Sequence, residues 1–276
     1  MRRILVAAGA VATLTVAGCG AATTATLDNA KLSASEVLLQ TAQKADDVTS
    51  YSADVVVNFS GAQEGAGSVQ GSMLYQKTPQ IATDITLNQV SFRGQNLPGA
   101  VRAIVRGDVA YVKVDALKNL VGATKPWIKL DLRQLGDRAG VNVDQYLAQA
   151  QQFDLKNSVA LLTASTDAKA VGTESVGGED TTHYSGTFKV DQAAKQLPQD
   201  AQAELKSRLA EAKDVKFDAW IDGQGLPRKV ELNGGVADKG TFTATVLFKG
   251  FNDAVTIYTP PADQVGEMPG RAPVGG

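Results

Sequence analysis

The sequence has very few of the side chains from which enzymes and metal proteins build their sites. Its 276 residues include one cysteine and one histidine, Cys19 and His183. A single cysteine cannot form a disulfide within the chain, and it cannot supply the ligands of a zinc–cysteine or iron–sulfur centre. No cofactor and no metal site are therefore expected. These absences favour a protein that holds a molecule over one that transforms it.

Charge is also scarce. Charged residues make up 20% of the chain and the formal net charge is −2, so the composition imposes no basic surface. Nucleic acid is therefore not expected as a partner. By contrast, 43% of the residues are hydrophobic, which is enough for a substantial core.

An apolar run lies near the N-terminus, behind the positive charges of Arg2 and Arg3. Residues 4–16 are apolar except for glycine and threonine. This is the layout of an export signal. The run is shorter than the ~20 residues that a membrane-spanning helix needs. The sequence therefore favours a cleaved signal over an uncleaved anchor.

The end of this run is similar to the lipobox of bacterial lipoproteins. Small residues lead into Cys19, and in lipoproteins the cysteine at this place receives the lipid and becomes the first residue of the mature protein. We predict a signal peptide over 1–18, lipid attachment at Cys19 and a tether over 19–33. This places the protein on the outer face of the cytoplasmic membrane. A signal peptidase site of the A-x-A kind, without lipid, is the alternative.

A single folded domain is expected over residues 34–260, followed by a flexible tail rich in proline and glycine over 261–276. Ser33 and Glu36 have the spacing of a capping box. The apolar residues that follow recur with the helical period, which predicts a helix over 34–47.

Most of the remaining chain alternates between apolar and polar residues, as strands with one buried face do. The alternation falls into two blocks, about residues 51–132 and 171–258, and residues 143–153 between them have helical spacing. Because strands and helices do not alternate along the chain, the pattern favours an α+β fold with an antiparallel sheet over a parallel, doubly wound sheet.

The period of two also predicts which apolar residues share one sheet face. If a cavity lies between the sheet and the helices, these residues line it, and a register slip of one residue would exchange the faces. A filled core is the alternative, because protein interiors pack densely. The candidate lining residues are Val55, Val57, Phe59, Met73, Tyr75, Ile85, Leu87, Ile128, Leu130, Phe242, Val246 and Phe248.

The polar residues that could carry chemistry do not form a recognisable constellation, so no catalytic residue is predicted. His183 lies on the expected wet face of a strand, and no Gly-x-Ser-x-Gly motif accompanies it. Asp218 and Asp222 flank Trp220 on one strand face, a pattern more typical of simple solvation than of acid–base catalysis. For Trp127 and Trp220, packing is favoured over contact with membrane headgroups.

Three stretches in the second half of the chain resemble a known family. In order they are 181–190, 218–230 and 248–257, with the sequences TTHYSGTFKV, DAWIDGQGLPRKV and FKGFNDAVTI. They resemble the LppX/LprG/LprF lipoproteins of actinobacterial envelopes and, more remotely, LolA- and LolB-type lipoprotein carriers. The hairpin at 107–112 and the strand at 127–130 are similar to the first half of that family.

The resemblance implies a curved antiparallel half-barrel sheet with helices on its concave face and an apolar cavity between them. It implies a non-enzymatic, membrane-anchored lipoprotein that binds or carries an acylated lipid or glycolipid of the envelope. Each CH₂ taken out of water contributes ~0.8 kcal/mol to such binding. Two alternatives remain: an interaction, assembly or signalling module with a filled core and an envelope protein as partner, and an exported hydrolase.

Overall fold

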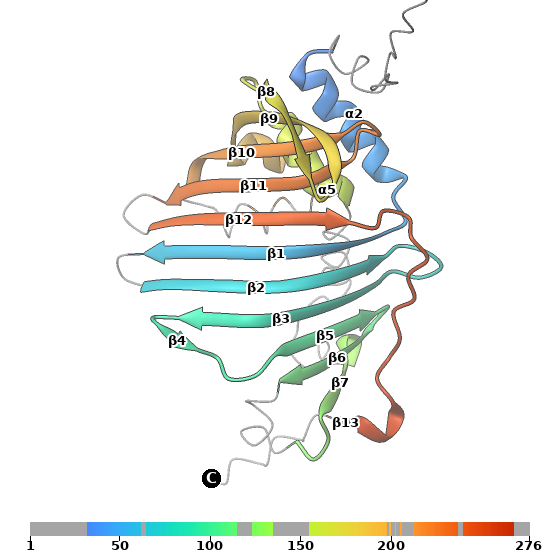
Figure 1. Cartoon of the computed structure of the whole chain (residues 1–276). Helices are drawn as coiled ribbons and strands as arrows, with labels where there is room; N and C mark the ends of the chain where they lie inside the picture. Colours follow the sequence, from blue (N-terminus) through green and yellow to red (C-terminus); the bar gives the residue numbers. More distant parts are fainter. Residues whose placement is uncertain are drawn as a thin grey trace, which may run out of the picture.

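The computed structural model describes residues 32–61, 65–114, 123–134, 155–197, 199, 202, 205, 212–236 and 240–267. The predicted signal peptide, Cys19, nearly all of the tether and the expected helix at 143–153 lie outside these residues, as do residues 268–276. Figure 1 shows the whole chain.

Most of the described chain belongs to one large curved sheet (Figure 1). Within the described ranges its strand order is β13-β7-β6-β5-β3-β2-β1-β12-β11-β10-β9-β8, with β4 beside β3. Neighbouring strands are antiparallel, except that β13 runs parallel to β7. The strands are β1 (Ser50–Gly61), β2 (Gly65–Gln76), β3 (Ala82–Phe92), β4 (Gln95–Asn96), β5 (Val101–Arg106), β6 (Val109–Val114), β7 (Trp127–Asp131), β8 (Lys169–Val176), β9 (Glu179–Lys189), β10 (Ala212–Asp222), β11 (Pro227–Val236), β12 (Gly240–Lys249) and β13 (Val265–Glu267).

The two predicted blocks of strands are the two halves of this sheet, except that the second block ends at Lys249 and residues 253–261 form no strand. Within each block, strands that follow one another in sequence pair as neighbours, as short connections favour. The blocks meet where β1 pairs with β12, which places Val55 opposite Val246 and Phe59 opposite Phe242. The antiparallel sheet expected from the alternating pattern is therefore present as one continuous layer.

The first helix, α2 (Ala34–Asp46), begins at the predicted residue. The Ser33 side chain accepts a hydrogen bond from the Glu36 backbone N–H, and Glu36 Oε2 accepts one from the Ser33 N–H at 2.8 Å. This is the predicted capping box. Hydrogen bonds from the Ser33 side chain and backbone also hold the pKa of the Glu36 carboxyl below its usual value.

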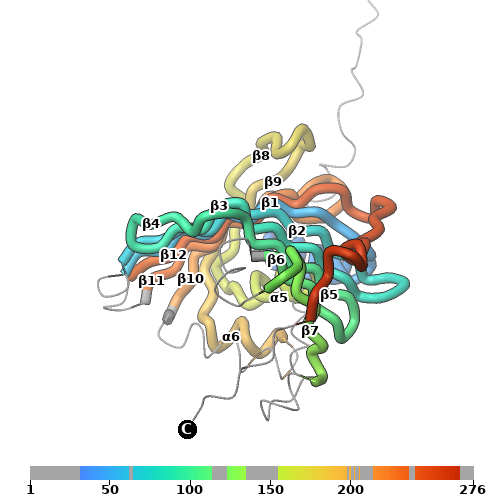
Figure 2. Tube along the Cα trace, turned by 90° about the horizontal axis from the view of Figure 1, so that it is seen from below, coloured from blue at the N-terminus to red at the C-terminus, as the bar shows by residue number. Residues whose placement is uncertain are grey.

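The main core lies between one side of the sheet and the helices. These are α2, α5 (Leu155–Ala160), the 3₁₀ turn η3 (Leu161–Ala164) and α6 (Val190–Ala194). Leu38 and Leu155 of the helices share a buried cluster with Tyr51 and Phe217 of the sheet. Seen from below, the sheet arches over α5 and α6 (Figure 2). The side that faces the helices is called the concave face, and the opposite side the outer face.

The C-terminal part of the structure corrects the predicted domain boundary at residue 260. Residues 262–267 form the 3₁₀ turn η4 (Ala262–Gln264) and β13, which pairs with β7 so that Val265 lies opposite Trp127. Pairing with β13 satisfies backbone groups at the edge of β7 that would otherwise need water. The folded part therefore continues to Glu267.

Candidate functional site

The concave face is a continuous apolar surface built by the strand register. Directly paired residues of antiparallel strands point to the same side of a sheet. Val57 of β1 pairs with Val69 of β2 and Ala244 of β12, and Val55 pairs with Gly71 and Val246. None of the residues with this orientation in β1, β2 and β12 is charged.

The register places all twelve predicted lining residues on this one face. Met73 pairs with Ile85, Gly71 with Leu87, and Phe59 with Phe242. Farther along the sheet, Ile128 and Leu130 pair with Val112 and Ala110, which continue the same face through β5 and β6. The predicted alternation of faces is thus confirmed. That these residues line a cavity stays a prediction.

Burial divides this face into two parts. The packed part consists of Tyr51, Ala53, Met73, Tyr75 and Phe248, all inaccessible to solvent or nearly so. The half-buried part, in the middle of the sheet, consists of Val55, Val57, Phe59, Leu87, Phe242 and Val246, and Ile85, Ile128 and Leu130 on the same face are half-buried as well.

The boundary between the two parts runs across individual strands. In β1, Tyr51 and Ala53 are each 1% exposed, whereas Val55, Val57 and Phe59 are half-buried.

Two aromatic rings lie flat against the sheet in the half-buried part. A Cβ atom added at Gly67 would lie 2.3 Å from Cζ of Phe59, and one added at Gly234 would lie 2.3 Å from Cε1 of Phe242. Only glycine leaves room for rings that cover the neighbouring strand so closely. The two glycines therefore keep this region smooth, with aliphatic side chains and ring faces as its surface.

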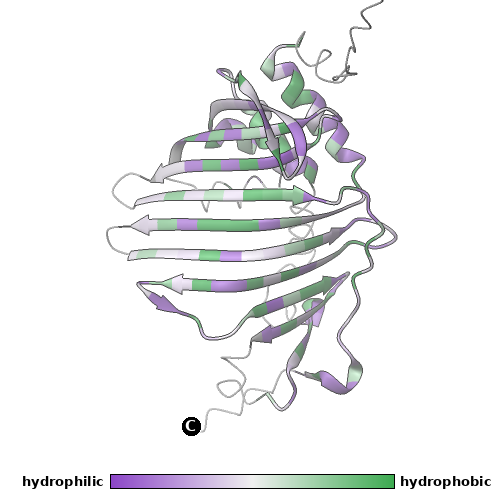
Figure 3. Cartoon of the chain, in the orientation of Figure 1, coloured by the Kyte–Doolittle hydropathy of each residue, from purple (hydrophilic) through white to green (hydrophobic). Residues whose placement is uncertain are grey.

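The outer face is polar over the same strands, and Figure 3 shows the resulting alternation of hydrophobic and hydrophilic bands. Asp54 of β1 forms an ion pair with Lys249 of β12, and the side-chain amide of Asn58 donates a hydrogen bond to Thr243 Oγ1 at 3.4 Å. This agrees with the predicted wet face.

The prediction that Asp218 and Asp222 are simply solvated is wrong. Their residues are 8% and 3% exposed. Asp222 Oδ1 accepts hydrogen bonds from the backbone N–H groups of Gln224 and Leu226, both at 2.9 Å, and its Oδ2 accepts one from Arg228 Nε at 2.6 Å. Asp222 therefore holds the turn between β10 and β11.

Asp218 belongs to a layer of side chains on the outer face. Its Oδ1 lies 2.9 Å from His183 Nε2, and its Oδ2 lies 3.1 Å from Lys216 Nζ. Burial would raise the pKa of the Asp218 carboxyl. Hydrogen bonds from Ser185, Lys216 and His183 and the charge of Lys216 outweigh it and hold the pKa below its usual value.

Trp220 belongs to the same layer of side chains on the outer face. Its ring stacks on His183 with 4.4 Å between centroids, and its indole N–H donates to Glu174 of the edge strand β8. Lys229 Nζ lies 4.2 Å from the centroid of the Trp220 ring. These neighbours cover the outer face of β10, which alternation along one strand does not reveal. Trp127 and Trp220 are each 6% exposed, so the packing predicted for both is confirmed.

Two other features are absent from the described part of the chain. No group of three or more His, Cys, Asp or Glu side chains there is arranged to hold a metal ion. No helix there has the length and apolar character needed to cross a membrane.

Comparison of the sequence with known proteins finds relatives in Streptomyces. An uncharacterised 31.2 kDa protein of Streptomyces griseus is 32% identical over 170 residues, which are 59% of this chain and 55% of the relative. A Streptomyces coelicolor protein whose name describes it as a candidate lipoprotein is 28% identical over 168 residues, 59% of this chain and 50% of the relative. The chain thus spans about half the length of these curated relatives. No protein-family model matches.

Two solved structures of mycobacterial proteins, one of them described as a lipoprotein, match most of the chain. LppX of Mycobacterium tuberculosis has 17% identity and a TM-score of 0.44, over 81% of this chain and 98% of that one. LprF of Mycobacterium bovis has 14% identity and a TM-score of 0.49, over 82% of this chain and 96% of that one. LppX and LprF, two members of the family that the sequence motifs resemble, are thus among the solved structures to which the chain is similar.

Proposed function

We propose that the protein binds acyl chains of an envelope lipid or glycolipid against the half-buried part of the concave face. The observation that carries the proposal is the contrast along β1, where buried residues give way to half-buried apolar residues on the same uncharged face. An alkyl chain laid there would remove apolar surface of both partners from water. The flat rings of Phe59 and Phe242 suit a ligand without hydrogen-bonding groups.

The predicted lipid at Cys19 would hold this surface close to a supply of its ligand. One acyl chain gives only marginal membrane binding, whereas two or more give a durable anchor. With the anchor at Cys19 and the first helix beginning at Ala34, the domain would remain near the outer face of the cytoplasmic membrane. In this proposal the protein presents or carries lipid over short distances and catalyses no reaction.

The test uses the full chain carrying Cys19→Ala, so that any lipid found is bound and not attached. Organic extraction of the purified protein followed by mass spectrometry should detect acyl lipid. Val57→Asp should lower the amount of bound lipid by about tenfold or more, because a carboxylate against an alkyl chain loses its hydration without gaining a partner.

Val56→Asp is the matched control. Val56 is the adjacent residue of the same strand, is also half-buried and points to the outer face. Bound lipid should be unchanged in this variant, and thermal unfolding shows whether both variants fold. Equal lipid content in the two folded variants, or no lipid in the parent protein, would refute the proposal and favour the interaction module with a filled core.

A further inference from the structure

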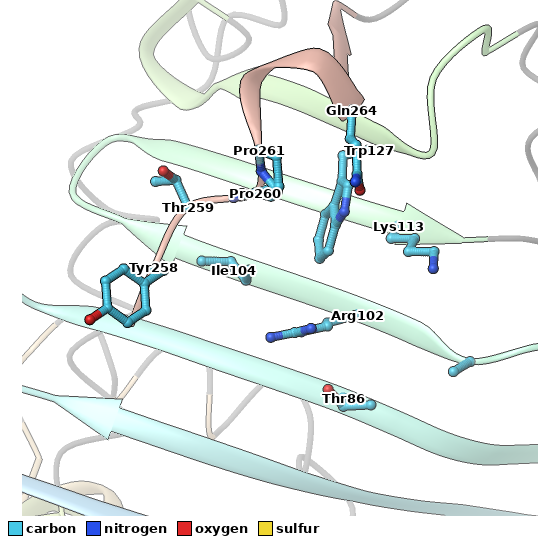
Figure 4. A pocket seen from close by; sticks show the side chains of 11 residues that line it. Thr86, Arg102, Ile104, Lys113, Trp127, Tyr258, Thr259, Pro260, Pro261 and Gln264 are labelled. Carbon is cyan, nitrogen blue, oxygen red and sulfur yellow. The ribbon is translucent and has the colours of Figure 1, made fainter. Parts of the chain in front are cut away.

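A pocket lies on the outer face, on the opposite side of the sheet from the proposed lipid site. Residues 254–261 cross strands of this face between β12 and η4, and a space of about 410 Å³ remains between this segment and strands β3, β5, β6 and β7 (Figure 4). Small-molecule sites commonly enclose ~300–1,000 Å³. The pocket is therefore large enough for a ligand of one or two rings.

Both walls of the pocket are held in place. On the sheet side, Ile104 and Trp127 belong to a buried cluster with Ala82 and Ile257, separate from the main core. The crossing segment is anchored through Ile257, which is 3% exposed and whose backbone N–H donates to Gln76 Oε1 at 3.4 Å. The pocket thus does not depend on an ordering step when a ligand arrives, and this lowers the cost of binding.

The lining is divided between apolar and polar groups. Trp127, Pro260 and Pro261 form apolar walls. Tyr258 lies at the rim and is 75% exposed. Thr86, Thr259 and Gln264 supply hydroxyl and amide groups. Such a lining suits a ring that is apolar on one side and carries hydroxyl groups at its edge.

The charged side chains of the lining are both cations, Arg102 and Lys113. Arg102 is oriented by a bidentate pair with Asp84, in which Nε lies 2.9 Å from Oδ1 and Nη2 lies 2.6 Å from Oδ2. Its guanidinium also lies 5.7 Å from the centroid of the Trp127 ring. A guanidinium has five N–H donors, and Asp84 accepts from only two of its nitrogens.

We propose that this pocket binds a sugar that carries a carboxylate or a phosphate group. The anionic group would lie at Arg102 and Lys113, the C–H face of the ring against Tyr258 and Trp127, and the hydroxyl groups toward the threonines and Gln264. The same chemistry occurs in soluble sugars and in the headgroups of anionic glycolipids. Because the pocket lies on the outer face, this inference is independent of lipid binding on the concave face.

The two tryptophans of the chain provide a direct measurement. In ¹⁵N-labelled full chain carrying Cys19→Ala, the two indole N–H signals are assigned with Trp220→Phe and followed during titration. Glucuronate and glucose 6-phosphate should shift the Trp127 signal and leave the Trp220 signal in place. Glucose, which lacks the anion, and benzoate, which lacks the hydroxyl groups, should bind at least about tenfold more weakly.

Two variants test the assigned contacts. Arg102→Lys keeps the positive charge but loses the planar guanidinium, which can donate two parallel hydrogen bonds, and should weaken glucuronate binding by about tenfold. Tyr258→Ala should weaken it by about fivefold through loss of ring contact. The control for Arg102→Lys is Arg133→Lys, because Arg133 also forms an exposed ion pair with an aspartate. The control for Tyr258→Ala is Val171→Ala, because Val171 is an exposed apolar residue of β8. Both controls should bind like the parent.

Vesicles separate the two sources of the sugar. If phosphatidylcholine vesicles with glucuronosyl diacylglycerol shift the Trp127 signal and free glucuronate does not, the ligand is a headgroup, whereas a shift with the free sugar identifies a soluble ligand. No shift with any of these probes, equal shifts with glucose or benzoate, or shifts confined to Trp220 would overturn the inference. Lipid content of Tyr258→Ala should stay unchanged, so that failure here is distinct from failure of the lipid proposal.

Discussion

The packed and half-buried parts of the concave face are made by the same strands, yet their side chains have different surroundings. Tyr51 and Phe248 pack together, with 5.6 Å between ring centroids, in the cluster that includes the helix residues Leu38 and Leu155. Phe242 lies on the same face of the same strand as Phe248 but is only half-buried. The residue type and the face of the strand on which it lies therefore do not by themselves determine how deeply a side chain is buried.

The outer face differs between strands as well. On β10, Asp218 and Asp222 are buried in hydrogen-bonded arrangements. On β1, Asp54 and Asn58 are exposed. The sheet is thus covered on both faces at β10, where Phe217 and Ile221 of the concave face are also buried, whereas the outer face of β1 meets solvent.

The largest expected effect comes from replacing matched phenylalanines in β12. Phe248→Ala should lower the free energy of unfolding by about 3–5 kcal/mol, because it leaves a cavity in a packed core. Phe242→Ala should cost less than about half of that, since its ring already meets solvent, and should instead reduce bound lipid. Urea unfolding and lipid analysis of both variants measure the contrast. Equal losses of stability would show that the two parts do not differ.

The next largest effect is expected at Asp222. Asp222→Ala should lower the free energy of unfolding by about 3 kcal/mol, because Arg228 and two backbone N–H groups lose their acceptor in a buried site. Asp54→Ala, at an exposed ion pair on the outer face of β1, should change it by less than about 1 kcal/mol. Chemical unfolding of both variants tests whether polar groups also stabilise the covered region more strongly.

The smallest effect is a pH dependence at Asp218. Because its pKa is lower in the folded protein than the ordinary value of 3.8, its contribution to stability is fully present above that value. The contribution is lost as the pH falls through the folded-state pKa. The stability difference between the parent protein and Asp218→Asn should therefore shrink as the pH falls from about 5 toward 3. A difference that grows on acidification would contradict the assigned direction.

Local patterns were sufficient for the elements that depend on neighbours in sequence. The capping box of Ser33 and Glu36 and the hairpin between β5 and β6 are formed by residues a few positions apart. The twelve apolar residues share one face as their alternation predicted, because a strand reverses its side-chain direction at every residue. These features need no knowledge of which segments meet in space.

Long-range contacts explain what the local patterns missed. The burial of Asp222 depends on Arg228 and on the turn that follows, and that of Asp218 depends on His183 from another strand. The pairing of β13 with the edge of β7 joins segments more than 130 residues apart. The outer-face pocket likewise combines four strands with the segment 254–261.

The sequence by itself determined the antiparallel strands, the first helix and the identity of the apolar face, because the periods of two and 3.6 are properties of the local chain. Only the tertiary structure decided that β1 and β12 join the two blocks, and that helices cover Tyr51 while Val57 stays half-buried. The physical reason is that the burial of a side chain results from contacts between distant segments, whereas the face to which it points results from the backbone geometry of its own strand.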